Sequence, residues 1–196
     1  NETGCNIQEF PIVDKPYKNT LDILWVGKLD FRKQLGLAIR SVAIAMNPDI
    51  RLHIVGGGDD RIYRNLAEEL NISDQCIWHG IKKHYEVQKI MQESDVFFFT
   101  SVAEGTPHVV LEAISNNLPV LCIDTCGQGD SVNKWVGRKI ELSNPKRSEI
   151  DFAEQLNYFF SNRDVLKEMA GNCAQRQQEL SWEMKAKNMV SIYERI

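Results

Sequence analysis

The stretch "DVFFFTSVAEGTPHVVLEA", residues 95–113, joins a run of apolar residues to a helix-forming segment through a loop that contains a glycine and a proline. Three phenylalanines after a valine are typical of a buried β-strand, and "HVVLEA" has the composition of an α-helix. Gly105 lets the backbone approach a neighbour closely, and Pro107 is favoured in the first turn of a helix. The stretch therefore predicts a strand, a tight loop and a helix, with the carboxylates of Glu104 and Glu112 on either side of the turn.

Strand and helix patterns alternate on both sides of this stretch, since short apolar runs are followed by segments with hydrophobic residues at helical spacing. The predicted strands cover residues 22–27, 50–58, 75–80, 95–100, 118–124 and 137–142. The predicted helices cover residues 33–46, 61–70, 85–94 and the segment from about 107, and only helical patterns follow residue 149, in segments such as 151–160. This alternation predicts β-α-β crossovers, so we expect a Rossmann-like three-layer α/β/α domain with an open parallel sheet of about six strands.

The bulk composition is that of an ordinary globular domain. The chain has 196 residues, 43% of them hydrophobic, and a formal net charge of −4, which predicts no general attraction to nucleic acid. The five cysteines are odd in number and contain no C-x-x-C pair, which favours free thiols in a reducing compartment. No apolar run approaches the roughly 20 residues that span a bilayer, and the first residues lack the pattern of a signal peptide. We therefore expect a cytoplasmic domain.

The loops at the carboxyl ends of the strands are the candidate site, because ligands bind there in open parallel sheets. They are "GKLDFRK", "GGGDD", "GIKKH", "SVAEGTP" and "TCGQGD"; all contain glycine, and the first and third also carry lysines. Free N–H groups at a helix start attract anions, and a carboxylate such as that of Glu112 can accept hydrogen bonds from both hydroxyls of a ribose. These features favour an anionic, sugar-rich ligand. A solvated helix start with two exposed acids is the alternative interpretation of the residues alone.

The same stretch resembles the E-x7-E signature of retaining glycosyltransferases of family 4, the group 1 glycosyltransferases, which have the two-domain GT-B fold. "ILWVGKLDFRKQLGLAI" is similar to the first strand and loop of the family's nucleotide-binding half, and "LHIVGGGDDRIYRNLAEELNISDQCIWHG" to its next strand-helix-strand unit. "SWEMKAKNMVSIYERI" resembles the closing helix. The resemblance runs from about residue 21 to the end, and it implies the C-terminal, nucleotide-sugar-binding half of a GT-B enzyme.

The resemblance implies roles for individual residues. As catalytic residues, Lys28 and Lys33 would hold the donor's diphosphate and neutralise the leaving group, and Glu104 would contact the transferred sugar. The substrate-binding residues that it implies are Gly27, Ile81, Gly105, Thr106, Pro107, His108 and Glu112. Among these, Glu112 would bind the ribose and Ile81 would lie near the nucleobase. The nucleotide-diphosphate sugar is the donor substrate, and neither a metal nor a cofactor is expected.

Several positions depart from the family pattern. Lys28 stands where the family usually has Arg, which keeps the charge but loses the forked geometry of a guanidinium. Gln34 replaces a preferred Gly, so we expect a differently shaped turn there. Asn117 replaces the Gly that commonly ends the signature helix, a change that the left-handed cap conformation accepts. "TCGQGD" matches the family's G-G-x-x-E loop only in part, with Asp130 in the Glu position.

The resemblance covers only the second half of a GT-B enzyme. Residues 1–20 resemble the remnant of an interdomain linker, and residues 21–196 resemble the donor-binding domain, without the N-terminal acceptor domain. The full enzyme would transfer a sugar from a nucleotide-diphosphate donor to an acceptor hydroxyl with retention of configuration, in polysaccharide or glycoconjugate synthesis. We expect these 196 residues alone to bind donor weakly and to turn nothing over.

The implied partners are the nucleotide-sugar donor and a sugar or lipid-linked acceptor held by the missing domain, with no nucleic acid. The expected location is cytoplasmic, and the full-length enzyme of such a family can contact the inner face of the membrane peripherally. Two alternatives stay open. One is another GT-B enzyme, such as a nucleotide-sugar epimerase or a sugar-phosphate synthase, and the other is a non-catalytic interaction domain of the same fold.

The remaining chemistry-bearing side chains give weaker indications. Cys122 and Cys126 lack a partner His nearby, so we expect a buried strand thiol and a buried loop thiol. His79, His84 and His108 do not have the spacing of metal ligands. The last helix carries an apolar stripe that we expect to pack against the domain: Trp182, Met189, Ile192 and Tyr193.

Overall fold

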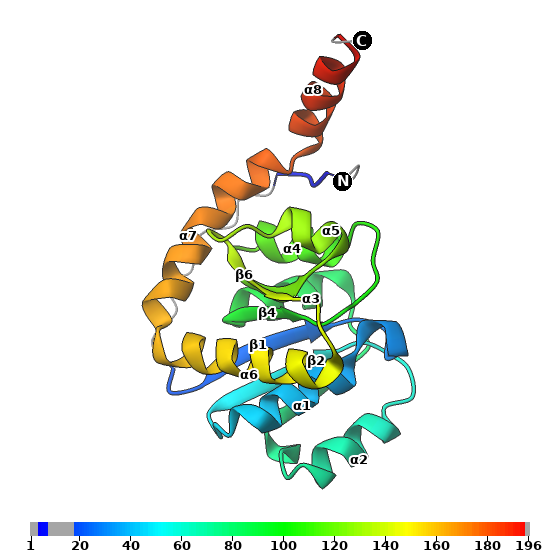
Figure 1. Cartoon of the computed structure of the whole chain (residues 1–196), viewed down its shortest axis with the longest axis vertical. Coiled ribbons are helices and arrows are strands. Elements are labelled where there is room, and N and C mark those ends of the chain that lie inside the picture. Colours follow the sequence, from blue (N-terminus) through cyan, green and yellow to red (C-terminus); the bar gives the residue numbers. More distant parts are fainter. Residues whose placement is uncertain (1–3, 8–17, 195–196) are drawn as a thin grey trace.

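Six parallel strands form one sheet in the order β3-β2-β1-β4-β5-β6 (Figure 1). They are β1 (Leu21–Val26), β2 (Ile50–Val55), β3 (Cys76–Gly80), β4 (Val96–Phe99), β5 (Val120–Asp124) and β6 (Gly137–Glu141). The computed structural model describes residues 4–7 and 18–194, so most of the predicted linker lies outside the described residues. The sheet confirms the predicted Rossmann-like fold class.

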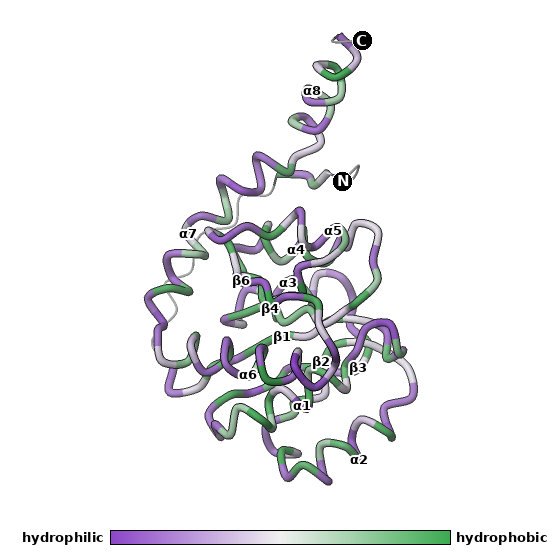
Figure 2. Tube along the Cα trace, viewed as in Figure 1, coloured by the Kyte–Doolittle hydropathy of each residue, from purple (hydrophilic) through white to green (hydrophobic). Residues whose placement is uncertain are grey.

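Helices cover both faces of the sheet, because successive strand residues point to opposite sides. Leu21 and Ile23 of β1 pack with α1, α2 and α6 on one face, whereas Leu24 packs with α3 and α4 on the other. Figure 2 shows hydrophobic residues along the central strands, while the helices alternate between hydrophobic and hydrophilic residues. The helices are α1 (Leu35–Ala45), α2 (Arg61–Glu69), α3 (His84–Glu93), α4 (His108–Ser115), α5 (Cys126–Ser131), α6 (Pro145–Ser161), α7 (Arg163–Glu179) and α8 (Trp182–Tyr193).

The order of the strands reverses at β1. From β1 the chain adds β2 and then β3 on one side, and α3 carries it back to β4 on the other side of β1. β1 is therefore hydrogen-bonded to both β2 and β4. The loops that follow β1 and β4 lie next to each other at this switch point, which is where open α/β sheets bind their ligands.

Two elements differ from the expectation. "TCGQGD", predicted as a loop, contains the short helix α5, in which Gly129 N donates to Thr125 O at 3.0 Å. Its glycines and polar residues carry no hydrophobic periodicity, so the pattern hides the helix. α6 begins at Pro145, before the predicted start, because the Asn144 side chain accepts a hydrogen bond from Arg147 N and caps a polar first turn.

The last helix projects away from the domain at the top of Figure 1. α8 contains no buried residue, so the expectation that its apolar stripe packs against the domain is wrong. The stripe residues are between 46% and 70% exposed: Trp182, Met189, Ile192 and Tyr193. Among the described residues, Cys5 forms a parallel bridge with Ser181 at the base of α8. In the described part of the chain, no helix combines the length and the apolar character needed to cross a bilayer.

Candidate functional site

The loop after β1 is attached to the end of β4. It contains a single 3-10 turn, η1 (Phe31–Lys33). Ser101 Oγ lies 3.1 Å from the carbonyl oxygen of Arg32, and the hydroxyl of Thr100 donates to the carbonyl oxygen of Lys33 at 2.9 Å. These contacts fix the backbone of η1 beside the loop that carries Glu104.

Two residues that replace family glycines take left-handed backbone conformations. Gln34, which follows η1, has a φ of 54°, and Asn117, which follows α4, has a φ of 55°. Glycine adopts such angles without a steric cost, and Asn is the next most tolerant residue. The predicted left-handed cap at Asn117 is confirmed. At Gln34 a larger side chain is accommodated in a conformation that favours glycine.

The first cluster of the site surrounds the carboxylate of Glu104. The Lys33 ammonium nitrogen lies 2.6 Å from Glu104 Oε1, and the Ser101 hydroxyl donates to the same oxygen at 2.7 Å. The Arg32 guanidinium lies 3.7 Å from Glu104 Oε2. Burial alone would raise the pKa of Glu104, but the hydrogen bonds from Lys33 and Ser101 and the two positive charges outweigh burial and lower it. Glu104 is therefore held in its ionised form.

The turn after Glu104 is supported by α5. Gly127 N donates to Gly105 O at 3.0 Å, and a Cβ atom on Gly127 would lie 2.2 Å from that oxygen. Only glycine at this position lets α5 approach the turn so closely. Gly105 itself borders open space, because a Cβ there would meet no atom within 4 Å. Pro107 was expected in the first turn of this helix. α4 begins at His108, so Pro107 instead directly precedes the helix.

The second cluster contains Glu112, about one turn into α4. Glu112 Oε1 lies 4.0 Å from Nδ1 of His84, the first residue of α3, and the Glu112 side chain is 36% exposed. Burial raises the pKa of Glu112, and the charges of His84 and His108 act in the opposite direction. This carboxyl group thus has no strong cationic partner in the described chain and remains available to hydroxyl donors.

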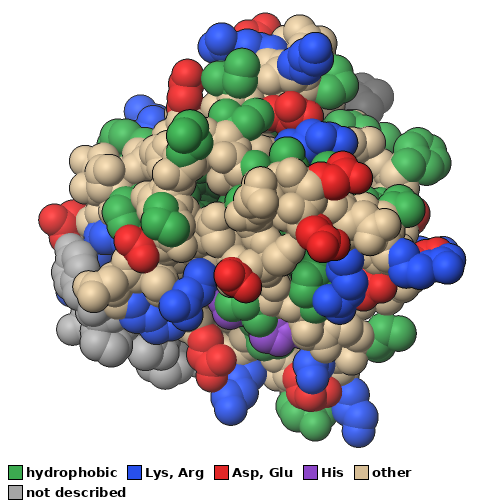
Figure 3. Space-filling view, turned by 90° about the horizontal axis from the view of Figure 1, so that it is seen from below, with side chains coloured by type: hydrophobic (Ala, Val, Ile, Leu, Met, Phe, Trp, Pro, Cys, Tyr) green, Lys and Arg blue, Asp and Glu red, His purple; other side chains and the backbone are tan. Residues whose placement is uncertain are grey.

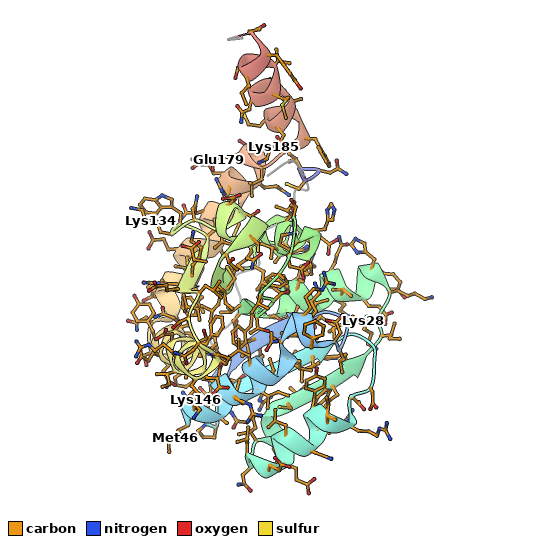
Figure 4. All side chains as sticks on the ribbon, turned by 45° about the vertical axis from the view of Figure 1, so that its right-hand side comes forward. Lys28, Met46, Lys134, Lys146, Glu179 and Lys185 are labelled. Carbon is orange, nitrogen blue, oxygen red and sulfur yellow. The ribbon has the colours of Figure 1, made fainter. Side chains whose placement is uncertain are left out.

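The other predicted residues lie at the same edge of the sheet but outside the two clusters. Gly27 and Thr106 are half-buried, and His108 is exposed. Lys28 is exposed on the right-hand side of the domain in Figure 4, and its side chain makes no ion pair with any residue that the structure describes. Ile81 is 82% exposed on the loop after β3. The structure therefore brings Lys33 to Glu104 but does not bring Lys28 or Glu112 into contact with that pair.

Three residues in these clusters were not predicted from the sequence. Arg32 is adjacent to the candidate residue Lys33 in "DFRK", and His84 ends the candidate loop "GIKKH". Their position beside residues already selected could have identified both as members of the site. Ser101 carries no such signal. Its contact with Glu104 depends on the turn of the chain between them, which the sequence pattern does not fix.

The two cysteines that were predicted to be buried have different environments. Cys122 is buried in β5, and burial raises the pKa of its thiol to about 12. Cys126 is exposed, which corrects the prediction. It occupies the first position of α5 with a φ of 52°, where the chain turns from the strand end into the helix. The thiol therefore faces solvent near the candidate site.

A hydrogen-bonded row of polar side chains crosses three strands elsewhere on the sheet. His53 Nε2 lies 3.4 Å from Asp22 Oδ1, and His53 Nδ1 lies 2.9 Å from His79 Nε2. Burial and the neighbouring charge of His53 lower the pKa of His79. Within the described ranges, no group of three or more His, Cys, Asp or Glu side chains could hold a metal ion.

Two cavities lie away from the clusters. A cavity of about 690 Å³ is lined by Lys18 and Arg163, and another of about 580 Å³ beside β6 is lined by Trp135 and Tyr158. Neither is lined by a residue of the Glu104 or Glu112 clusters. Figure 3, seen from below, shows acidic and basic side chains interspersed and not separated by sign, so attraction of an anion depends on local groups.

Comparisons with known proteins agree with this architecture. Protein CapJ from Staphylococcus aureus is 30% identical over 150 residues, 68% of this chain and 38% of that protein. The lipopolysaccharide outer core galactosyltransferase WaaB, in its apo form, has a TM-score of 0.79 at 24% identity and covers 99% of this chain and 55% of that chain. The pneumococcal O-GlcNAc transferase GtfA, in complex with UDP and GlcNAc, has a TM-score of 0.75 at 16% identity and covers 88% of this chain and 35% of that chain.

The chain spans only part of the length of the proteins that it matches. It covers 38% of the length of CapJ and 55% of the WaaB chain. The sequence profile of the family described as "Glycosyl transferases group 1" matches residues 6–179, most of the chain. The chain therefore belongs to the group 1 glycosyltransferase family.

Proposed function

We propose that this chain is the donor-binding domain of a retaining, family 4 glycosyltransferase. In this proposal the domain holds a nucleotide-diphosphate sugar, and the sugar passes to an acceptor hydroxyl that another part of the protein binds. The observation that carries the proposal is the pair of Lys33 and Glu104, 2.6 Å apart at the switch point of the sheet. A cation and a carboxylate held together at that place suit a ligand that carries both phosphates and hydroxyls.

Lys33 is proposed to bind the diphosphate. Its ammonium group has three donors, of which one is used by Glu104, so two remain for phosphate oxygens. Its side chain is only 15% exposed, and a charge with little access to water acts strongly on a neighbouring anion. As the bond between sugar and phosphate breaks, this charge would stabilise the leaving diphosphate. Lys28, an exposed side chain at the same edge of the sheet, would add a second positive charge near the diphosphate.

Glu104 and Glu112 are proposed to bind hydroxyl groups. Glu104 Oε1 accepts two hydrogen bonds from the protein, which leaves Oε2 for a hydroxyl of the transferred sugar. Glu112, which is half-buried on α4, would accept hydrogen bonds from the ribose. Gly27 after β1 and the turn before α4 would line the sugar and phosphate; the residues of that turn are Gly105, Thr106, Pro107 and His108. Ile81, in the loop after β3, would lie near the nucleobase.

The site is an open edge, which fits a cleft that another part of the protein completes. We propose that this part binds a sugar or lipid-linked acceptor, and that the whole enzyme acts in the cytoplasm, with peripheral contact to the membrane. Synthesis of a polysaccharide or glycoconjugate is the proposed role. It is supported by the similarity in fold to an enzyme named as a lipopolysaccharide galactosyltransferase.

Thermal shift with UDP, GDP and ADP tests the proposal. A ligand at ten times its Kd adds about 1.4 kcal/mol of stability, which raises the Tm of a domain of this size by about 2–6 °C. We expect such a rise with one of the nucleotides, and we expect Lys33→Ala and Glu112→Ala each to abolish it.

Lys18→Ala is the matched control for Lys33→Ala. Lys18 also forms an ion pair with an acid, Asp22, at 2.9 Å, but at the opposite end of β1. We expect Lys18→Ala to lower the Tm of the chain without changing the rise in Tm that the nucleotide causes. If no nucleotide raises the Tm of the unmodified chain, the donor-binding proposal is wrong and a non-catalytic interaction domain becomes the better interpretation.

A further inference from the structure

We infer that Arg32 is a further cation for the diphosphate of the donor, and that it contributes more to this binding than Lys28. The inference rests on the proposed function, because it assigns a residue to the same site. The contact between Arg32 and Glu104 is not predictable from the sequence. The guanidinium of Arg32 lies 3.7 Å from Glu104 Oε2, on the side of the carboxylate opposite to Lys33.

The backbone of Arg32 is fixed at the site. Its carbonyl oxygen accepts a hydrogen bond from Val102 N at 3.4 Å and lies 3.1 Å from Ser101 Oγ. The Ser101 hydroxyl donates its hydrogen to Glu104 Oε1 at 2.7 Å, so the same residue contacts both the peptide of Arg32 and the acid that Arg32 faces. The guanidinium therefore starts from an anchored position, and less freedom is lost when it binds a ligand.

The guanidinium has hydrogen-bonding capacity to spare. A separation of 3.7 Å is an ion-pair distance but is too long for a hydrogen bond. In the described chain, the Arg32 side chain donates no hydrogen bond, and it is 48% exposed. An arginine has five N–H donors in a planar fork that fits two oxygens of a phosphate at once. Arg32 can thus turn toward a diphosphate without breaking a hydrogen bond.

The charges around Glu104 also favour an anion. Lys33 and Arg32 carry one positive charge each against the single negative charge of Glu104, so these three side chains have an excess of one positive charge, while the Asp30 carboxylate is engaged by Lys33 N at 3.2 Å. Lys28 is exposed, and no side chain in the described residues holds its ammonium group in one place. A solvated, unrestrained lysine binds a phosphate weakly. For this reason the inferred order of contributions is Lys33, then Arg32, then Lys28.

Calorimetric titration of the chain with UDP, GDP and ADP, and with the matching monophosphates, tests the inference. We expect Arg32→Ala to weaken binding of the preferred diphosphate about tenfold while changing the monophosphate less than about twofold. Arg32→Lys, which keeps the charge and loses the fork, should lie between the unmodified chain and Arg32→Ala. Lys28→Ala should weaken diphosphate binding by less than about threefold.

Arg40→Ala is the matched control. Arg40 is 46% exposed and lies 3.7 Å from a glutamate, Glu149, so it resembles Arg32 in exposure and pairing but lies on α1 away from the site. It should leave both affinities unchanged. An equal loss for monophosphate and diphosphate in Arg32→Ala, or a larger loss in Lys28→Ala, overturns the inference and leaves the proposed function intact. Absence of binding by every nucleotide to the unmodified chain overturns both.

Discussion

Two glutamates that look equivalent in the sequence lie in opposite electrostatic environments. Glu104 is surrounded by Lys33, Ser101 and Arg32, and these groups lower its pKa against the effect of burial. In the described chain, Glu112 faces His84 at 4.0 Å, and burial raises its pKa more than the charges of His84 and His108 lower it. The first is a fixed anion that organises cations, and the second is a carboxyl group that stays free for a ligand.

Replacing Glu104 with glutamine should reveal its ion pairs in the pH dependence of stability. A carboxyl group whose pKa is lowered by folding stabilises the protein above its unfolded pKa, and that contribution is lost as the pH falls. At pH 7 we expect Glu104→Gln to lower the free energy of unfolding by about 1–2 kcal/mol. The difference from the unmodified chain should shrink below about pH 4.3, the pKa of an unfolded Glu. Urea unfolding at several pH values measures it.

Glu112→Gln provides the contrast, because the pKa shift has the other sign. A raised pKa means that ionisation disfavours folding, so removal of the charge should leave stability at pH 7 unchanged or slightly higher.

A loss of stability in Glu104→Gln that persists unchanged at pH 3.5 would show that the ion pairs are not its cause.

At the scale of elements, the position of the site depends on α5. This helix was absent from the sequence prediction, yet it holds the Gly105 turn through Gly127, and the close approach requires that Gly127 have no Cβ. A six-residue helix built from Cys, Gly, Gln, Asp and Ser has no apolar period to detect. Its formation depends on the strand before it and the turn beside it.

Gly127→Ala tests this support. The added Cβ would lie 2.2 Å from Gly105 O, so either α5 or the turn must move. We expect a loss of about 1–3 kcal/mol in stability and weaker nucleotide binding, because Glu104 precedes the displaced turn. Gly171→Ala is the control: it adds a Cβ to α7 with no atom within 4 Å and should stabilise the chain by about 0.5–1 kcal/mol. Chemical unfolding and calorimetry measure both. Normal binding by Gly127→Ala would contradict the supporting role of α5.

The sequence predicted most elements and the edge of the sheet at which Lys33 and Glu104 meet. The strands were predictable because each is a short apolar run, as in β4, where all of Val96–Phe99 is buried. The contacts within the site were less accessible. Lys33 and Glu104 are 71 positions apart, and nothing local indicates that Arg32 reaches the same carboxylate while Lys28 does not. Such contacts follow from how the loops after β1 and β4 pack together.

At the scale of the whole molecule, α8 is a separate unit that rests on a small base. The expectation of packing failed because an apolar stripe at helical spacing states only that a helix has an apolar face, not what covers it. Here that face is exposed, with Ile192 at 54% and Tyr193 at 70%. The domain core closes without it.

Removal of residues 185–196 should therefore have little effect on the domain. The deletion keeps Ser181, whose side chain caps α8, and the bridge to Cys5. We expect the Tm to change by no more than about 2 °C, since surface changes alter stability by about 0.5 kcal/mol or less. The rise in Tm with nucleotide should be preserved. A fall of more than about 4 °C would mean that α8 contributes to the core despite its exposure.

The exposed thiol at the start of α5 gives the domain a built-in attachment point for a spectroscopic reporter. Three of the other cysteines are buried and Cys5 is partly covered, so a maleimide dye would react first with Cys126. Its neighbour Gly127 donates a hydrogen bond to Gly105 O in the turn that directly follows Glu104. A fluorophore at this position would sense occupancy of the site in real time, in a chain with no engineered residue.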